Sequence, residues 1–318
     1  MDLDVILPFH RIDTFLVQAL ESIGNSVEVE LRLILVDDRV DQDNQIHPYL
    51  KQFRSVEYVK TRGGMGYGAA LETGTQFIAT DVVALFNSDD LVHPRRFVNQ
   101  VRNLDKFDIS VASMKRIDEN GRSTSSLMGQ LGCKTFDPIF LLLGSYGANA
   151  TWCMRKEWWQ NNAFFDSDEC LDWRIALRSF KNSEIHYSPE ELYLYRKHSL
   201  QKTKQKKIPV ERMWPVYMEW EKFWKSFDLP AVSYEVFNFL ATPWNKGCDY
   251  SQLQINEITD ALNSAASSLP KIISAEVSGL LRQRCLFALN NESSVLSSMR
   301  FLLHGTPGIP RLIKTMYS

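Results

Sequence analysis

The sequence predicts an α/β protein whose main domain is built on a sheet with parallel strands and is followed by a helical region. Short β-branched runs alternate with helical patterns through roughly the first two hundred residues, which is typical of βαβ units. The 318 residues suffice for one large α/β domain with an extension. Beyond about residue 207 only helical patterns remain.

The elements expected in the main domain follow one another in a regular order. A strand, a helix and two further strands come first, and a glycine-rich turn that opens a helix follows the third strand. The expected strands are 4–9, 31–38, 56–61, 81–90, 148–154 and 192–198, with a hairpin at 108–125 around the Asn120-Gly121 turn. The expected helices are 14–23, the segment after the turn at 62–68, and 170–180.

The helical region begins with an aromatic stripe. Five residues recur there at a spacing of three or four, and such a stripe predicts helix packing rather than a ligand site. They are Met213, Tyr217, Trp220, Trp224 and Phe227. We therefore expect a catalytic domain at 1–206 and a helical extension at 207–318. The basic run at 202–207 is expected to be a solvated or mobile lid rather than a nucleic-acid site.

Composition narrows the classes of function. A hydrophobic content of 44% and a mean hydropathy of -0.24 describe an ordered globular protein, and no apolar run approaches the roughly 18 residues of a membrane span. The net charge of -2 gives no overall attraction to nucleic acid. The five cysteines include no C-x-x-C pair, so neither a zinc ribbon nor a disulfide framework is indicated.

The two ends of the sequence suggest a location. The opening "MDLDVILPFHR" has acidic residues where a secretory signal carries positive charge, so we expect a cytoplasmic protein. The segment 299–318 mixes basic and apolar residues, which is compatible with peripheral contact at the inner face of a membrane. The helical region could also close over an acceptor or form a homodimer, but ordinary helix packing is favoured.

Polar residues follow three of the expected strands. Asp37 and Asp38 follow the second strand, Arg62 and a run of glycines the third, and Asn-Ser-Asp-Asp at 87–90 the fourth. Parallel strands present a ligand at their carboxyl ends, where these residues meet. One acidic strand end can be only a turn or a helix cap, but several at one edge predict a site.

Two adjacent carboxylates repel each other, and a divalent cation would relieve the repulsion. Mg²⁺ and Mn²⁺ take oxygen ligands from one or two carboxylates, with phosphate oxygens and water in the remaining positions. The glycines at 63–68 would let a diphosphate approach the backbone, and Arg62 could pair with it or with the base. The spacings of the P-loop and of the dinucleotide fold are missing, which disfavours ATPases and dehydrogenases.

The chain resembles the family 2 glycosyltransferases of the GT-A fold. "VILPFHRIDTFLVQALESI" is similar to their opening strand and helix, "LILVDDRVDQDN" to their V-V-D-D-G-S-x-D, and "LFNSDDLVHPRR" to their D-x-D-D-x-x-x-P. The matches run over roughly residues 3–200. The resemblance implies a Rossmann-like mixed sheet flanked by helices, a nucleotide-diphosphate sugar donor with UDP-sugars first, Mn²⁺ or Mg²⁺, and inversion at the anomeric carbon.

The resemblance also implies donor-binding positions in the first three strands and their loops. Pro8 lies in the opening motif. Asp38, together with Asp37, falls where the family holds the nucleobase or ribose, and Arg62 and Gly66 fall in the donor-binding loop.

The acidic loop covers the family's metal position. Asp89 and Asp90 are both candidate metal ligands, and Ser88 is a candidate donor contact. Asn87 replaces the usual first Asp, so this position can still hydrogen-bond ribose hydroxyls but brings no charge.

The segment "DSDECLDWRIALRSF" is similar to the family's E-D pair, which precedes an aromatic residue and an Arg six positions after the Asp. Asp172, Trp173 and Arg178 fit this pattern, and the resemblance makes Asp172 the general base that deprotonates the acceptor hydroxyl. Leu171 replaces the usual Glu. The alternative bases are Asp168 and Glu169. An acidic residue at a helix start can also serve only the helix dipole.

The segment "YLYRKHSLQKT" resembles the family's closing Y-R-x-H. There His198 would reach the metal or diphosphate, and Arg196 would neutralise the leaving group. A lone histidine is more often structural, but this one follows a strand and stands among basic residues.

The acceptor is the least defined part. A glycan, a lipid-linked glycan or a protein would fit, and Tyr146, Trp152 or Trp173 could stack on a sugar ring, although Trp152 fits a core position better.

Two alternative functions stay open. A nucleotidyltransferase would usually carry a glycine- and lysine- or arginine-rich signature where this chain has "PFHRID". A catalytically silent sugar-nucleotide binding module would fit Asn87 and Leu171.

Overall fold

The computed structural model describes most of the chain up to residue 238. The described residues are 1–40, 46–128, 141–142, 144, 147–199, 201, 208–227, 231, 233–234 and 237–238. They belong to two compact units, one formed by Met1–Leu141 and Ser145–Lys206, the other by Leu142–Gly144 and Lys207–Ser318. The expected lid at 202–207, Tyr146 and the segment 299–318 lie outside the described residues.

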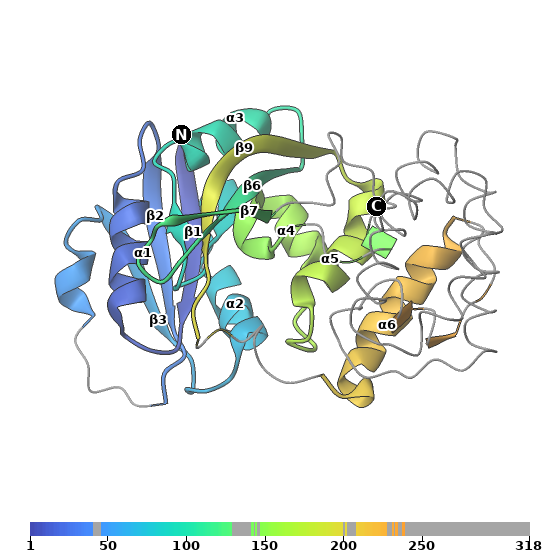
Figure 1. Cartoon of the computed structure of the whole chain (residues 1–318). Helices are drawn as coiled ribbons and strands as arrows, with labels where there is room; N and C mark the ends of the chain where they lie inside the picture. The colour runs from blue at the N-terminus through green and yellow to red at the C-terminus, as the bar shows by residue number, and fades with distance from the viewer. Residues whose placement is uncertain are drawn as a thin grey trace, which may run out of the picture. The chain divides into compact units, whose positions relative to one another are not determined.

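The first unit is organised around one mixed sheet. Its strands are β1 (Asp2–Phe9), β2 (Glu30–Asp37), β3 (Ser55–Lys60), β4 (Val82–Leu85), β5 (Leu91–Val92), β6 (Ile109–Ile117), β7 (Ser123–Met128), β8 (Trp152–Arg155) and β9 (Ile185–Arg196). Among the described residues the order is β3-β2-β1-β4-β8-β6-β9-β5, with β7 paired to β6. The strands from β3 to β4 are parallel, and β8 runs antiparallel to β4. Figure 1 shows the long, curved β9 crossing this sheet.

Helices cover both faces of the sheet. They are α1 (Thr14–Gly24), α2 (Tyr67–Thr75), α3 (Arg96–Asn103), α4 (Lys156–Asn162) and α5 (Leu171–Ser179). Side chains of β1 alternate between the faces: Leu3, Val5 and Leu7 join the apolar residues of α1 and α3 in one cluster. On the other face Gly74 of α2 lies so close that an added Cβ would be 2.7 Å from the Ile6 side chain.

The burial of β1 on both faces fixes the position of its carboxyl end. Leu3, Val5, Ile6 and Leu7 are all fully buried, and each such side chain contributes about 1.5–3 kcal/mol to the free energy of unfolding. β1 lies between β2 and β4 in the sheet. The loops that follow these three strands are therefore held side by side at one edge.

Several predicted elements are confirmed with small shifts at their ends. The first three strands, the helices α1, α2 and α5, and the β6–β7 hairpin all occur where the sequence indicates them. A mixed sheet flanked by helices was the expected fold, and this is what the first unit contains.

The strand predicted at 81–90 is wrong over its second half. β4 ends at Leu85, and residues 87–90 leave the sheet before β5 pairs with β9. Phe86 makes one more backbone hydrogen bond to β1, from its N–H to the Ile6 carbonyl oxygen at 3.0 Å, and its ring packs on Tyr193. The polar residues at 87–90 therefore sit in a loop rather than in a strand.

The last strand of the sheet is longer than predicted. β9 begins at Ile185 rather than 192, and its register with β6 jumps between Ser188 and Glu191. This irregularity surrounds Pro189, and polar residues there hide the period-two pattern. The strand predicted at 148–154 begins instead with a 3₁₀ turn, Asn149–Thr151, and helices α3 and α4 were not predicted.

The described part of the second unit is mainly α6 (Val210–Lys225). The aromatic stripe of this helix is a packing surface, as predicted: Met213, Tyr217, Trp220 and Trp224 are buried. The rings of Trp220 and Trp224 stack with centroids 5.1 Å apart. Trp220 also donates a hydrogen bond to the carbonyl oxygen of Leu142 at 2.9 Å.

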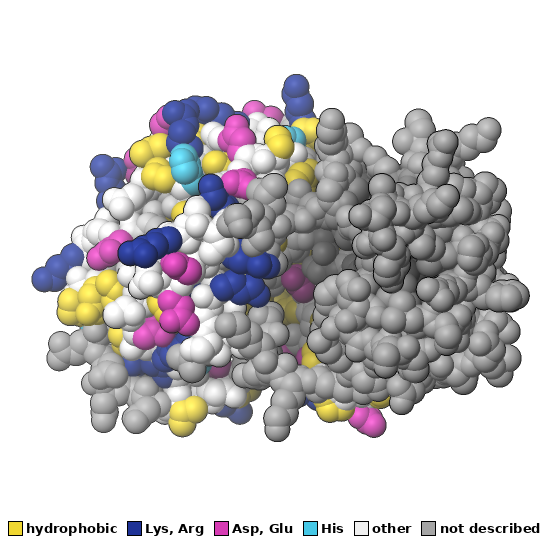
Figure 2. Space-filling view, in the orientation of Figure 1, with side chains coloured by type: hydrophobic (Ala, Val, Ile, Leu, Met, Phe, Trp, Pro, Cys, Tyr) yellow, Lys and Arg dark blue, Asp and Glu magenta, His cyan; other side chains and the backbone are white. Residues whose placement is uncertain are grey.

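In the described part of the chain no helix is long and apolar enough to cross a membrane. On the face shown in Figure 2, acidic and basic side chains of the described residues are interspersed. This mixture agrees with the small net charge of -2.

Candidate active site

The residues predicted to form a site lie at the carboxyl edge of the parallel strands. In the register of the sheet Phe9 of β1 stands beside Asp37 of β2, and Asp37 stands beside Lys60 of β3. Pro8 pairs with Val36 one step inside this edge and is buried. The loop after β4 reaches the same edge, because β4 is the other neighbour of β1.

The Asp37 side chain makes structural hydrogen bonds within the protein at this edge of the sheet. Its side chain is fully buried and accepts hydrogen bonds from Arg39 at 2.9 Å (Nε) and 2.7 Å (Nη2), and from the Tyr58 hydroxyl. Burial alone would raise its pKa, but these hydrogen bonds outweigh burial and hold the pKa below the ordinary value. The expected contact of Asp37 with a nucleobase or ribose does not agree with this placement, because both its oxygens are taken.

Asp38 is committed to the glycine-rich turn. Its carboxylate accepts hydrogen bonds from the backbone N–H of Met65 and of Gly66, both at 2.9 Å, and from the Thr61 hydroxyl. Only 6% of the residue is exposed. The turn needs an acceptor for its N–H groups, and Asp38 supplies it, so this side chain is not directed at a donor as expected.

The start of α2 is occupied by a carboxylate of the chain itself. Asp168 accepts hydrogen bonds from the N–H groups of Tyr67 at 3.1 Å and Gly68 at 2.6 Å. A Cβ on Gly68 would lie 2.7 Å from this carboxylate, and one on Gly66, whose φ is +96°, would also collide with it. The glycines therefore admit Asp168 rather than the expected diphosphate. As a helix cap, Asp168 is a poor alternative for the general base.

Arg62 remains available for a ligand. It is exposed in the turn between β3 and α2 and makes no hydrogen bond or ion pair with the described part of the chain. Two exposed apolar side chains, Val40 and Met65, stand in the neighbouring segments. The segment after β2 and the glycine-rich turn are in close contact, since a Cβ on Gly64 would be 3.1 Å from the Val40 side chain.

The two adjacent carboxylates of the loop after β4 point in opposite directions. Asp90 is fully buried and accepts hydrogen bonds from the Arg196 N–H at 2.7 Å, the Tyr193 hydroxyl at 2.5 Å and Asn87 Nδ2 at 3.3 Å. Burial, and next the charge of Asp89, raise the pKa of Asp90 to about 8. Asp90 therefore ties the loop to β9, and its oxygens are not open to a metal.

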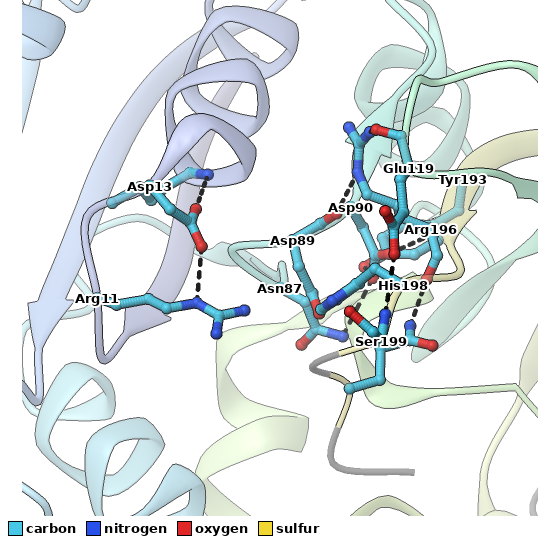
Figure 3. Close-up of polar contacts among 12 residues, drawn as sticks. Arg11, Asp13, Asn87, Asp89, Asp90, Glu119, Tyr193, Arg196, His198 and Ser199 are labelled. Atoms are coloured by element: carbon cyan, nitrogen blue, oxygen red, sulfur yellow. Dashed lines mark hydrogen bonds and ion pairs between the residues drawn. The ribbon is translucent and has the colours of Figure 1, made fainter. Parts of the chain in front are cut away.

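Asp89 faces the other way, toward His198. Its Oδ2 lies 3.0 Å from Nε2 of His198, and its side chain is 29% exposed. The imidazole packs on the Phe15 ring at 4.9 Å, and its Nδ1 has no hydrogen-bond partner among the described residues. Figure 3 shows His198 beside Asp89, with Asn87 below and Arg196 behind.

Arg196 supports the backbone of this loop. Its guanidinium donates hydrogen bonds to the carbonyl oxygens of Asp89 at 2.9 Å and Glu119 at 2.8 Å, and to Gln18 Oε1 at 2.7 Å. The residue is fully buried, and burial lowers its pKa. The expected contact of Arg196 with a leaving group does not agree with this position, because the guanidinium is already used inside the protein.

Asp172 lies in the first turn of α5, after Cys170 with φ of +46°. Its Oδ1 accepts a hydrogen bond from the Trp173 N–H at 2.8 Å. The Trp173 ring is buried and donates to the Leu141 carbonyl oxygen, so it is a core residue rather than a sugar platform. Trp152 is a fully buried core residue as well, in agreement with the favoured interpretation.

Tyr67 connects Asp172 with the acidic loop. Its hydroxyl lies 3.3 Å from Asn87 Oδ1 and 3.0 Å from Asn149 Oδ1. Burial, and next the charges of Asp172, Asp89 and Asp90, raise the pKa of Tyr67. The Tyr67 backbone N–H donates to Asp168, just before α5, and its hydroxyl contacts Asn87, so the start of α5 with Asp172 lies on the same side of the sheet as the acidic loop.

Two residues of this site, Tyr67 and Asn149, were not recognised from the sequence. Tyr67 is the one aromatic residue inside the glycine-rich turn, which is a weak signal for a special position. No spacing rule connects it with Asn149, which lies 82 positions further along the chain. Ser88, which was predicted, is half-buried between Asn87 and Asp89.

Known proteins share both the sequence pattern and the fold. The model of glycosyl transferase family 2 matches residues 4–159. The structure of S. aureus TarS 1-349 in complex with UDP-GlcNAc is 15% identical, with a TM-score of 0.63 over 94% of this chain and 92% of that chain. The complex of TarS 1-349 with UDP is 16% identical, with a TM-score of 0.58 over 94% and 91%.

The longer S. aureus TarS structure is 15% identical, with a TM-score of 0.56 over 94% of this chain and 54% of that chain. No curated protein sequence matches the chain significantly. At these identities the structural likeness establishes the fold, which is the GT-A fold. Residues 4–159, which carry the strand ends and the acidic loop, therefore resemble glycosyl transferase family 2 in sequence as well as in fold.

Proposed function

We propose that the protein transfers a sugar from a UDP-sugar to an acceptor hydroxyl with inversion at the anomeric carbon. The observation that carries this is that Asp89 lies beside His198, while Tyr67 contacts both Asn87 of this loop and Asp168 of the segment that leads into Asp172. One group can hold the leaving diphosphate while a second deprotonates the nucleophile, as a direct displacement requires. Binding of UDP-GlcNAc and UDP by TarS supports the choice of donor.

Asp89 and His198 are the residues that would hold a divalent cation. Among the described residues no group of three or more Asp, Glu, His or Cys could do so, but GT-A sites need only one or two protein ligands beside phosphate oxygens and water. Asp89 Oδ2 and His198 Nε2 lie 3.0 Å apart, so the two side chains are close enough to bind one ion together. A bound Mn²⁺ or Mg²⁺ would stabilise the charge of the departing diphosphate.

Asp172 is proposed as the general base. It is only partly buried and stands at the amino end of α5, where the helix dipole favours its ionised form. Asp168 caps α2, which leaves Asp172 as the better placed carboxylate of this segment. The acceptor oxygen would approach from the side of Asp172 and the diphosphate would leave toward Asp89.

The exposed Arg62, with Val40 and Met65 beside it, is proposed to contact the nucleotide. It replaces Asp37 and Asp38 in this role, because both carboxylates are bound within the protein. The acceptor is proposed to be a glycan, a lipid-linked glycan or a protein that presents a hydroxyl.

Donor hydrolysis tests the proposal without knowledge of the acceptor. Wild-type protein is mixed with a panel of UDP-sugars, with and without Mn²⁺, and release of UDP is measured. Hydrolysis of at least one UDP-sugar is expected. Asp172→Asn should reduce it by about a hundredfold or more, since general-base catalysis contributes about 10²–10⁴, while the Kd for UDP stays within about twofold. Donor binding without any hydrolysis would favour a silent binding module, and no binding would refute the proposal.

A further inference from the structure

Asn149 has a buried amide that the protein satisfies only on one side. The residue is 5% exposed, its Oδ1 lies 3.0 Å from the Tyr67 hydroxyl, and its Nδ2 has no hydrogen-bond partner among the described residues. A buried polar atom without a partner costs free energy, and in native proteins it usually has a reason.

The Tyr67 hydroxyl stands between two amide groups. It has one proton, but it lies near two oxygens, Oδ1 of Asn87 at 3.3 Å and Oδ1 of Asn149 at 3.0 Å. Rotating the Asn149 amide by half a turn would let Nδ2 donate to Tyr67, which then donates to Asn87. Asn87 Nδ2 in turn donates to Asp90 at 3.3 Å. In either orientation one atom of the Asn149 amide remains without a partner.

The surroundings of this amide place it between the two halves of the proposed reaction. Asp89 and Asp90 belong to the loop that would face the diphosphate, and Asp172 would face the acceptor. Tyr67 touches Asn149 and, in the acidic loop, Asn87, and its backbone N–H donates to Asp168 just before α5. In a direct displacement the transferred sugar lies between the leaving group and the nucleophile. The Tyr67 hydroxyl can both donate and accept hydrogen bonds with uncharged groups.

We propose that Asn149 and Tyr67 form a polar subsite for the transferred sugar, in which the free side of the Asn149 amide binds a hydroxyl or acetamido group of the ring. This rests on the proposed function. Amide and hydroxyl groups match the uncharged donors and acceptors of a sugar, whereas they offer nothing specific to a diphosphate. The pair is thus a determinant of which sugar is bound rather than of nucleotide affinity.

The difference between the affinities for UDP-GlcNAc and for UDP tests this subsite. Both affinities are measured by calorimetry in Mn²⁺ for the wild type, Asn149→Ala and Tyr67→Phe. We expect both variants to weaken UDP-GlcNAc binding by about tenfold, the size of one or two lost hydrogen bonds, and to leave the Kd for UDP within about twofold. Asn103→Ala is the matched control, because within the described part of the chain the Asn103 side chain bonds only the Asn99 carbonyl oxygen on α3.

The binding measurements distinguish failure of the subsite from failure of the proposed function. Equal weakening of UDP and UDP-GlcNAc, or unchanged binding of both, would overturn the subsite and leave the proposed function intact. If wild-type protein binds no UDP-sugar, the proposed function itself fails. Asn149→Ser, which keeps a small polar group, gives a second measurement if Asn149→Ala does not fold, and thermal unfolding of each variant reports folding. Hydrolysis of UDP-GlcNAc should show a raised KM with kcat changed less in Tyr67→Phe.

Discussion

Asp89 and Asp90 show how a single residue step separates two roles. Asp90 accepts three hydrogen bonds inside the protein, each worth about 0.5–1.5 kcal/mol, and a cation would have to displace them. Asp89 has an exposed side and, among the described residues, only His198 as a side-chain partner, so it can turn to an ion at much lower cost. Burial, and next the repulsion from Asp89, raise the pKa of Asp90 to about 8. Asn87 fits this scheme, since an Asp there would add a third carboxylate beside Asp90.

Asp37 should matter for stability rather than for donor binding. Asp37→Asn leaves the Arg39 guanidinium, only 5% exposed, without its partner, and breaking a buried ion pair costs about 3–5 kcal/mol. Urea unfolding at pH 7 measures this loss. UDP affinity should change less than twofold in the folded variant. A loss of UDP affinity at unchanged stability would contradict this assignment and restore a direct donor contact.

The same residue gives a pH dependence whose sign follows from its pKa. The pKa of Asp37 is lower in the folded protein than its ordinary value of 3.8, so its ionised form favours folding. The contribution is complete above about pH 5 and disappears as the pH falls through the folded-state pKa. The stability difference between wild type and Asp37→Asn should therefore shrink between pH 5 and the acid-unfolding range. A constant difference over this range would show that the ion pair is not its source.

At the scale of secondary-structure elements, two carboxylates fix the glycine-rich turn at both ends. Asp38 holds the N–H groups of Met65 and Gly66, and Asp168 holds those of Tyr67 and Gly68. Asp168 lies in the segment just before α5, and α5 itself carries Asp172. The turn is thereby coupled to the segment of the proposed base, and Tyr67 at the first position of α2 is fixed between them.

Removal of the Asp168 cap should destabilise the protein. Asp168→Ala leaves two N–H groups at the start of α2 without their acceptor, and loss of a helix cap costs about 0.5–2 kcal/mol. Chemical denaturation measures the effect. Asp105→Ala, the same substitution at an exposed position, is the control and should change stability by less than about 0.5 kcal/mol.

A double-mutant cycle makes this assignment more specific. Gly68→Ala should be costly in the wild type, because the new Cβ would lie 2.7 Å from Asp168, and less costly when Asp168 is already Ala. Equal costs in both backgrounds would mean that Gly68 is needed for another reason. In that case the Asp168 carboxylate would not be the group that requires glycine at position 68.

Sequence patterns predicted the edge of the sheet well and the direction of its side chains poorly. The periodicity placed Asp37, Asp38, Asp89 and Asp90 beyond strand ends, because alternation and turn residues are local signals. Whether a carboxylate points into the protein depends on donors far away in the chain, such as Arg196, 106 positions after Asp90. The bulge of β9 was missed for the related reason that its partner β6 lies in another part of the sequence.

At the scale of the whole molecule, the site is assembled from segments spread between residues 62 and 198. Their side chains meet only when the sheet is formed, so ligand binding must favour the folded chain. Ligand that binds the folded state alone raises the free energy of unfolding by about 2.7 kcal/mol at a concentration of one hundred times Kd. For a chain of 318 residues this corresponds to a rise in Tm on the order of 5 °C.

Thermal unfolding can therefore separate the two carboxylates of the acidic loop without an activity assay. UDP with Mn²⁺ should raise the Tm of the wild type more than UDP alone, because the cation links the diphosphate to Asp89 and His198. Asp89→Ala should keep the rise caused by UDP alone and lose the part that needs Mn²⁺, whereas Asp105→Ala should keep both. Asp90→Asn keeps one of the two acceptor oxygens at its position and should retain an increment from Mn²⁺. Loss of that increment in Asp90→Asn but not in Asp89→Ala would reverse the roles assigned to the two residues, and with them the direction in which the diphosphate leaves.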